Sequence, residues 1–111
     1  MITVEDKPDF GRFQLVLDGE VAGFIAYEMH GPRVALMHTQ IEDRFAGQGL
    51  GVELVARALD EIRRRGGSVL PYCPFVRSFI ARNPEYEELV PAGVRPTFGL
   101  ADRESQAEGQ R

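Results

Sequence analysis

Three glycines that alternate along the chain, Gly47, Gly49 and Gly51, constrain this sequence more than any other feature. They follow an apolar, strand-like run and directly precede a strongly amphipathic helical pattern. Glycine allows backbone turns that other residues resist, and its missing Cβ lets a ligand approach the main-chain N–H groups. The first turn of the following helix adds unpaired N–H donors and a partial positive charge. The segment therefore predicts a turn that binds an anion, most often a phosphate.

The first half of the chain is expected to form an antiparallel meander. Residues 13–17, 21–29 and 34–41 are rich in β-branched and aromatic side chains, which favour strands. Asp18-Gly19 separates the first two runs and is a strong signal for a tight hairpin. Gly23 within the second run indicates a bulge. Three consecutive antiparallel strands are therefore expected before the glycine segment.

The second half predicts a crossover helix, a short strand and a last helix. Apolar residues recur at spacings of three and four, with acid–base pairs on the opposite face, so a helix is expected over residues 50–65. A short strand is expected over residues 68–73, parallel to the 34–41 strand. Pro71 cannot donate to a neighbouring strand and predicts poor pairing there. A helix is expected over Pro74–Arg82. The fold class is therefore α+β, a meander followed by a βαβ unit and a C-terminal helix.

Length and charge narrow the class of protein. A chain of 111 residues is expected to form one domain over residues 1–100, with a mobile polar tail over residues 101–111. The net charge of −4 and the lack of a long apolar run argue against a nucleic-acid binder and a membrane protein. The lone cysteine, Cys73, excludes an internal disulfide and fits a reducing cytoplasm. We expect no metal site, and a monomer or weak dimer.

Two familiar phosphate-binding patterns do not fit the glycine segment. A P-loop ends in Gly-Lys-Ser/Thr, whereas here Gly49 is followed by Leu50-Gly51. A dinucleotide-binding fold requires G-x-G-x-x-G and an acidic residue at the end of the next strand. The spacing here is G-x-G-x-G, and the next strand ends in Pro-Tyr-Cys-Pro. A tight turn without a ligand is the plainer alternative, but one glycine would suffice for it.

A third pattern, the acyl-coenzyme A signature Q/R-x-x-G-x-G/A, fits the segment. Arg44, Gly47 and Gly49 match it, and the region resembles the GNAT superfamily of N-acetyltransferases. The likeness covers residues 38–86 and includes the Pro-x-Cys-Pro segment. The loop motif and the Pro-x-Cys-Pro segment follow one another in the order found in minimal GNAT-like proteins of roughly a hundred residues, which this region resembles.

The resemblance implies a binding site for acetyl-coenzyme A. Main-chain N–H groups of the loop would hold the pyrophosphate, and strand groups at Thr39 and Ile41 would hold the pantetheine arm where the two parallel strands splay apart. Pro71 agrees with this, because it leaves strand groups without partners. Phe79 and Arg82 would line the site, with core packing and a solvated helix face as their alternatives. The implied loop residues are Arg44, Phe45, Ala46, Gly47, Gln48, Gly49, Leu50 and Gly51.

Cys73 and His38 are the candidate catalytic residues. Cys73 directly precedes Pro74, so it is expected to cap the last helix, where the positive helix end favours a thiolate. His38 lies toward the carboxyl end of its strand, and a parallel arrangement places both residues at one end of the sheet. Together they would deprotonate an amine or form a transient acyl-cysteine. A buried structural thiol and a structural histidine are the alternatives.

The sequence thus predicts an acetyl-coenzyme A-dependent N-acetyltransferase that acts on an unidentified amine. The alternative is a non-catalytic acyl-coenzyme A-binding or regulatory module. Many larger GNAT enzymes carry a tyrosine general acid in the helix after the splayed strand, but that helix has Phe79 and Ile80 here. They also have amino-terminal helices that shape the acceptor pocket, so the acceptor side is expected to be open in this chain.

Overall fold

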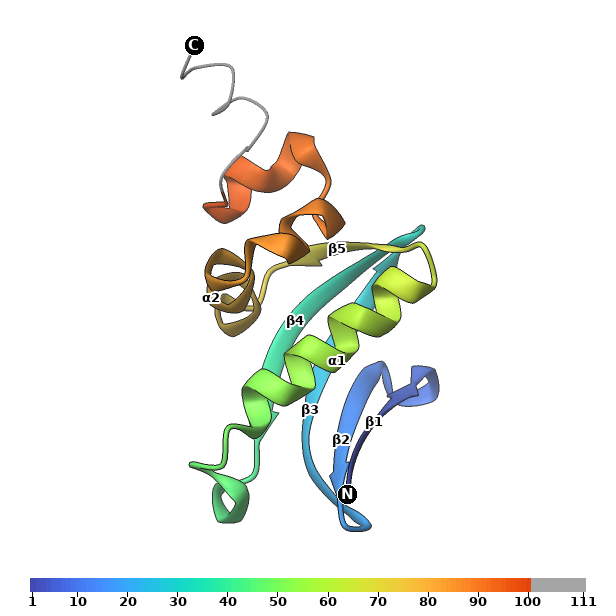
Figure 1. Cartoon of the computed structure of the whole chain (residues 1–111). Helices are drawn as coiled ribbons and strands as arrows, with labels where there is room; N and C mark the ends of the chain where they lie inside the picture. The colour runs from blue at the N-terminus through green and yellow to red at the C-terminus, as the bar shows by residue number, and fades with distance from the viewer. Residues whose placement is uncertain (101–111) are drawn as a thin grey trace.

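A mixed five-stranded sheet carries two helices on one of its faces (Figure 1). This computed structural model describes residues 1–100, so the tail expected at 101–111 lies outside the described residues. The strand order is β1-β2-β3-β4-β5, and neighbours are antiparallel except β4 and β5, which are parallel. The strands are β1 (Ile2–Lys7), β2 (Arg12–Leu17), β3 (Glu20–His30), β4 (Arg33–Ile41) and β5 (Ser68–Pro71). The helices are α1 (Leu50–Arg64) and α2 (Pro74–Arg82), and short 3-10 segments cover Pro8–Phe10, Asp43–Phe45, Pro84–Leu89 and Ala92–Phe98.

The expected order of elements is confirmed, with one strand added. The meander consists of β2, β3 and β4, with a two-residue turn at Asp18-Gly19, and the βαβ unit consists of β4, α1 and β5. The sequence pattern does not single out β1, because its alternation of Ile2 and Val4 with polar residues is brief. This strand nevertheless pairs with β2 along its whole length. The expectation of a strand over 68–73 is wrong at its end, since β5 stops at Pro71.

The apolar stripe of α1 builds the core against the sheet, which the helix crosses diagonally (Figure 1). On the sheet side, Phe13, Leu15 and Leu36 are at most 1% exposed. Each fully buried aliphatic side chain contributes about 1.5–3 kcal/mol relative to an exposed one. This contact therefore fixes the position of α1, and with it the position of its first turn. The buried residues of α1 are those of the predicted stripe: Leu50, Leu54, Val55, Ala58, Leu59 and Ile62.

The two parallel strands pair only over the first part of β4. Their pairing ends at Leu36 and Pro71, while β4 continues to Ile41 alongside β3. Proline has no N–H to extend the ladder, which agrees with the expectation that pairing fails there. The chain then turns into α2, and the Cys73 N–H donates to the Leu36 carbonyl oxygen at 2.8 Å. The outer half of β4 therefore has a free edge beside α2.

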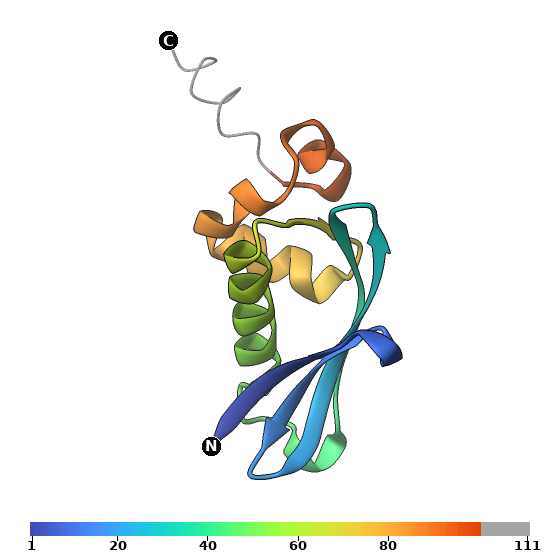
Figure 2. The ribbon, with the colours of Figure 1, turned by 90° about the vertical axis from the view of Figure 1, so that its right-hand side faces the viewer.

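The other face of the sheet is left open by both helices (Figure 2). Side chains of the central strands pack against one another on this face, and the Arg12 guanidinium lies 4.8 Å from the centre of the Phe24 ring.

Within residues 1–100, no helix is long and apolar enough to cross a membrane.

Gly23 tests how closely β3 approaches β4. A Cβ at Gly23 would lie 2.6 Å from the Gln40 carbonyl oxygen and would also meet the side chain of Ile41. Because the backbone cannot yield without breaking the strand pairing, we expect Gly23→Ala to lower the free energy of unfolding by about 1–3 kcal/mol, measured by urea denaturation. Gly93→Ala is the control, since its Cβ would meet nothing within 4 Å. An unchanged midpoint for Gly23→Ala would contradict the close approach of these strands.

Candidate functional site

The glycine segment forms a loop whose N–H groups are free. Gly47 and Gly49 have φ angles of 81° and 74°, in the left-handed region that favours glycine. Gly49 is the N-cap of α1, and no side chain caps this helix. Within residues 1–100, the six N–H groups of residues 47–52 donate to no backbone carbonyl, and the first bond of the helix runs from the Glu53 N–H to the Gly49 oxygen. Six donors at the positive end of a helix dipole form an anion-binding arrangement.

Gly51 has a separate role, which is to make room for Phe75 of α2. A Cβ at Gly51 would lie 2.9 Å from the Cζ atom of the Phe75 ring. The ring therefore lies directly against the first turn of α1, and 43% of the Phe75 surface stays exposed. The alternation of glycines thus combines two left-handed turn positions with one position of close helix–helix contact.

A hollow of about 300 Å³ opens at this loop. Seven of its nine lining residues belong to the set that the resemblance implies, and the other two are Val52 and Phe75. The loop residues are therefore gathered around one concave surface, although Gln48 is exposed and does not line it. The lining consists of Ile41, Phe45, Ala46, Gly47, Gly49, Leu50, Gly51, Val52 and Phe75.

Arg44 contacts carboxylates and does not line the hollow. Its guanidinium lies 3.1 Å from a Glu20 oxygen and 3.3 Å from a Glu42 oxygen, and 4.7 Å from the centre of the Phe45 ring. These contacts fasten the loop to the start of β3. The start of α1 contributes a partial positive charge at the loop, and a direct role for Arg44 in binding stays a prediction.

The hollow continues toward the free edge of β4. The Glu42 N–H donates to the Ala22 oxygen of β3 at 2.9 Å. Alternate residues of a strand direct their N–H and C=O groups to opposite sides. Those of Thr39 and Ile41 are therefore directed away from β3, toward the edge that β5 leaves open. An amide-bearing chain laid along this edge would find both donors and acceptors.

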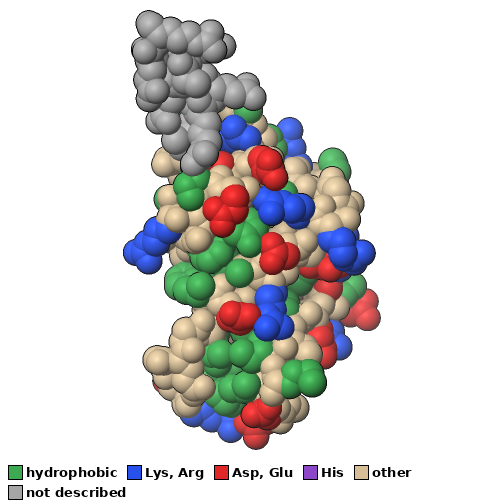
Figure 3. Space-filling model, in the orientation of Figure 1, with side chains coloured by type: hydrophobic (Ala, Val, Ile, Leu, Met, Phe, Trp, Pro, Cys, Tyr) green, Lys and Arg blue, Asp and Glu red, His purple; other side chains and the backbone are tan. Residues whose placement is uncertain are grey.

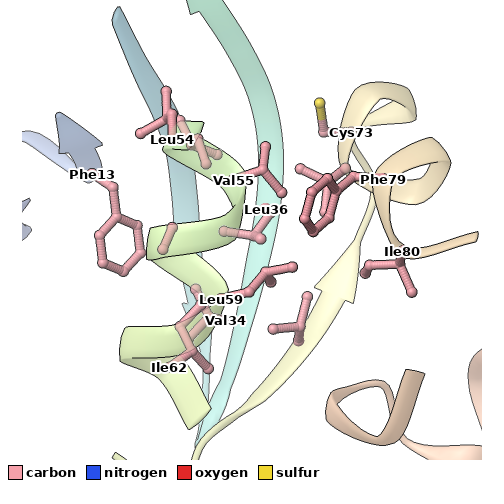
Figure 4. Packing of buried hydrophobic residues seen from close by; sticks show 14 of the residues in the cluster. Phe13, Val34, Leu36, Leu54, Val55, Leu59, Ile62, Cys73, Phe79 and Ile80 are labelled. Carbon is pink, nitrogen blue, oxygen red and sulfur yellow. The ribbon is translucent and has the colours of Figure 1, made fainter. Parts of the chain in front are cut away.

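Cys73 lies at the inner end of this edge. It is the N-cap of α2, and Figure 4 shows it at the start of that helix, beside β4. Its Sγ is 3.3 Å from the Oγ1 of Thr39, and only 3% of the residue is exposed. Within residues 1–100, this hydroxyl is the one side-chain hydrogen-bond partner of the thiol. The thiol is therefore a buried group in contact with the end of the strand edge.

His38 is not part of that contact. It precedes Thr39 in β4, so its side chain lies on the opposite face of the sheet. There its Nε2 lies 3.4 Å from the Oε1 of Gln40, and its ring centre is 6.2 Å from that of Phe24 in an edge-on arrangement. The structure does not bring the thiol and the imidazole together, because they flank the gap between β4 and β5 on different faces. The catalytic roles of Cys73 and His38 stay predictions.

Phe79 and Arg82 both line a second hollow, beside α2. Its volume is about 370 Å³, and it shares Val52 and Phe75 with the hollow at the glycine loop. Phe79 is 8% exposed and belongs to the core, where its ring centre is 5.4 Å from that of Tyr86. Arg82 is exposed. Phe79 therefore both packs in the core and lines the hollow.

The nearby tyrosines do not supply a proton donor at the thiol. The Tyr86 hydroxyl donates to Asp60 at 2.9 Å, and burial, followed by this hydrogen bond, raises the pKa of the phenol. The Tyr72 ring packs edge-on against Phe98, with 5.1 Å between the ring centres. Neither hydroxyl is a hydrogen-bond partner of the Cys73 Sγ within residues 1–100.

Two features of the site are not visible in sequence patterns alone. The Thr39 hydroxyl is a neighbour of the Cys73 thiol, and 34 residues separate the two, so no local spacing reveals the contact. Val52 lines both hollows. It does have a sequence signal, because it is an apolar residue on the polar face of α1, where it is 51% exposed.

The splay of β4 from β5, together with the glycine loop at the start of the crossover helix, defines a GNAT-like fold. A profile of the GCN5-related N-acetyl-transferases matches residues 12–89, and the chain belongs to this family. The resemblance that the loop motif and the Pro-x-Cys-Pro segment indicate is thereby confirmed. The chain is thus of the acetyltransferase class of enzymes.

A solved structure supports the fold. The solution structure of a GCN5-like protein from Staphylococcus aureus is similar with a TM-score of 0.60 and 16% identity, over 80% of this chain and 87% of that one. The ribosomal-protein-S18-alanine N-acetyltransferase from Escherichia coli has 27% identity and a TM-score of 0.48, over 52% of this chain and 38% of that one. No curated protein sequence matches this chain.

Gly49→Ala tests whether the loop conformation serves anion binding. An alanine with a left-handed φ raises the free energy of that backbone conformation by roughly 1 kcal/mol, so the loop should relax to another conformation. We therefore expect the affinity for inorganic pyrophosphate to fall several-fold, measured by calorimetric titration. Gly31→Ala is the matched control, with a φ of 64° and nothing within 4 Å of the added Cβ. It should lose similar stability and bind pyrophosphate as the parent does. Equal weakening in both variants would show that the loop has no special role.

Proposed function

We propose that this chain transfers an acetyl group from acetyl-coenzyme A to an amine. The observation that carries the proposal is the row of six N–H groups at residues 47–52, which have no backbone acceptor within residues 1–100 and lie at a hollow that reaches Ile41, the last residue of β4. A pyrophosphate flanked on one side by an amide-bearing arm has the chemistry that this arrangement can bind. The membership of the chain in an N-acetyltransferase family supports the same assignment.

The donor would lie with its reactive end near Cys73. The N–H groups of the loop would bind the pyrophosphate. The strand groups of Thr39 and Ile41 would pair with the amides of the pantetheine arm and polarise the thioester carbonyl. The thioester would then lie beside the Thr39 hydroxyl and the Cys73 thiol, which are 3.3 Å apart.

Two routes for the acetyl group fit this placement. In the direct route, a neutral amine attacks the thioester carbon, and the C–S bond breaks as the C–N bond forms. The proton that the amine releases would pass to a proton acceptor and from there to the departing thiolate. In the covalent route, the Cys73 sulfur attacks first, its proton passes to the departing sulfur, and the resulting acetyl-cysteine is then cleaved by the amine. Thr39 would orient the thiol in either case.

His38 would serve the acceptor side. The open face of the sheet carries its imidazole, and both it and Cys73 flank the gap between β4 and β5. An amine that reaches the thioester through this gap from the open face would meet the imidazole as a proton acceptor.

A non-catalytic acyl-coenzyme A-binding module is the second candidate. The observations in its favour are the burial of Cys73, which is 3% exposed, and the engagement of the Tyr86 hydroxyl with Asp60. It predicts binding without turnover, so one experiment separates the two functions.

Thioester cleavage with a panel of amines provides that experiment. We expect saturable binding of acetyl-coenzyme A and release of the coenzyme thiol that depends on at least one class of amine. Release is measured with a thiol reagent, and the acetylated amine by mass spectrometry. Saturable binding with no turnover for primary amines, amino acids, polyamines or peptide amino termini would favour the binding module.

Cys73→Ala separates the two chemical routes. We expect it to lower kcat by about 100-fold or more, and we expect the parent protein, incubated with acetyl-coenzyme A alone, to gain one acetyl group on Cys73. Thermal unfolding of the variant controls for the loss of a buried side chain. Full activity in a folded Cys73→Ala protein, with no acetyl group on the parent, refutes the covalent route and leaves the direct route.

A further inference from the structure

Arg12, on the open face of the sheet, makes no ion pair with a carboxylate within residues 1–100. The face that α1 presents is different, because acidic and basic side chains alternate over it (Figure 3), and Arg57 and Arg65 each pair with a carboxylate there. The guanidinium of Arg12 is instead held by uncharged groups. Its charge is therefore available to an anionic ligand.

Contacts with Gln14 and two phenylalanine rings fix the guanidinium of Arg12. Its Nε and Nη2 atoms donate to the Gln14 Oε1 at 3.0 and 2.6 Å, and its Nη1 donors have no partner within residues 1–100. Its Cζ lies 4.8 Å from the centre of the Phe24 ring and 5.7 Å from that of the exposed Phe10 ring. Because the planar group is already held, it would lose little rotamer freedom on binding a carboxylate.

Arg12 belongs to a row of residues that crosses four strands of the sheet. Lys7, Arg12, Ala26 and His38 are successive Cα partners on β1, β2, β3 and β4, and we call them the basic row. Registered partners direct their side chains to the same face, so the row lies on the open face. Neighbouring strands are about 4.8 Å apart, so the Cα atoms of Arg12 and His38 are about 10 Å apart.

Within the basic row, Arg12 is the cation that remains for a ligand. The Lys7 Nζ lies 3.3 Å from a Glu5 oxygen, so its charge is matched. The His38 Nε2 lies 3.4 Å from the uncharged Gln40 Oε1, and its imidazole is the proton acceptor of the proposed function. The row therefore offers an anion-binding group and a proton acceptor, with the latter beside the gap between β4 and β5.

Apolar surface separates these two groups. Ala26 lies between Arg12 and His38 in the basic row, and its short side chain leaves room above the sheet. The Phe24 ring lies 4.8 Å from the Arg12 guanidinium, and its centre is 6.2 Å from that of the His38 ring. A ligand with a carboxylate at one end, an amine at the other and methylene groups between them matches this order of charged and apolar groups.

We propose that the acetyl acceptor is a small amine that carries a carboxylate several bonds away from its nitrogen. Arg12 binds the carboxylate, the methylene groups cover Ala26 and Phe24, and the amine lies at His38 beside the gap. Arg12 thus determines which amine is bound and does not touch the reacting atoms. This inference rests on the proposed function and names the class of its acceptor.

Acetylation of 6-aminohexanoate and of 6-aminohexanamide tests the assignment, because the second compound differs only in lacking the charge. The parent protein should use 6-aminohexanoate with a kcat/KM about fivefold to tenfold higher, and the difference should lie in KM, since a charge-assisted hydrogen bond is involved. In Arg12→Ala the two amines should be used equally. Arg12→Lys should keep part of the preference, because lysine retains the charge without the planar fork.

Arg33→Ala is the matched control for the loss of one positive charge. Arg33 is an exposed arginine of β4 that lies outside the basic row, so this variant should keep the full preference. NMR titration of the whole chain measures binding apart from chemistry. The side-chain resonances of Arg12 Nε–H and of the Gln14 amide should shift with 6-aminohexanoate and stay in place with 6-aminohexanamide. Thermal unfolding checks that Arg12→Ala is folded.

The outcomes separate the acceptor class from the proposed function. Equal use of both amines by the parent, an unchanged preference in Arg12→Ala, or its loss in Arg33→Ala overturns the acceptor class and leaves acetyl transfer intact. Acetylation of an acidic peptide and of neither small amine also overturns it, since the occupant is then a peptide. Carboxylate-dependent shifts at Arg12 without turnover of any amine would contradict the proposed function while supporting the carboxylate site. Neither shifts nor turnover would contradict both.

Discussion

The end of strand pairing at Pro71 is the constraint on which the site depends. A proline cannot continue the ladder, so β5 stops while β4 runs on to Ile41. Within residues 1–100, the divergence leaves the outward N–H and C=O groups of Thr39 and Ile41 without a strand partner, and Cys73 lies at the start of α2. A sixth strand in this position would satisfy those groups. A ligand that presents amides can do the same, which is why a gap in a sheet serves as a binding surface.

The electrostatics of the site come mainly from the backbone. Arg44, the basic residue of the loop signature, is engaged by Glu20 and Glu42. The donors at residues 47–52 are therefore held in place by helix geometry and by the left-handed glycines. Such donors need no rotamer to be ordered on binding, and their direction is set before a ligand arrives.

Periodicity and turn chemistry predict most of this fold from the sequence. The stripe of α1 and the break at Pro71 follow from local residue types, and the glycine spacing points to the loop. The sequence pattern does not predict β1, because a strand at the edge of a sheet needs only a few alternating residues. The separation of His38 from Cys73 is not predicted for a different reason. The thiol contacts Thr39 on one face of β4 while His38 lies on the other face, and the sequence does not show which of these two faces Cys73 packs against.

The N–H groups of the loop lie at the start of the same helix whose apolar stripe packs into the core. A ligand held at the first turn of α1 therefore binds the helix that carries Leu50 and Leu54, which are 5% and 0% exposed in the core. Since only the folded chain presents these donors, any ligand bound there shifts the folding equilibrium toward the native state in proportion to its concentration. In a domain of this size, the level of available ligand thus contributes to how long the protein survives in its folded form.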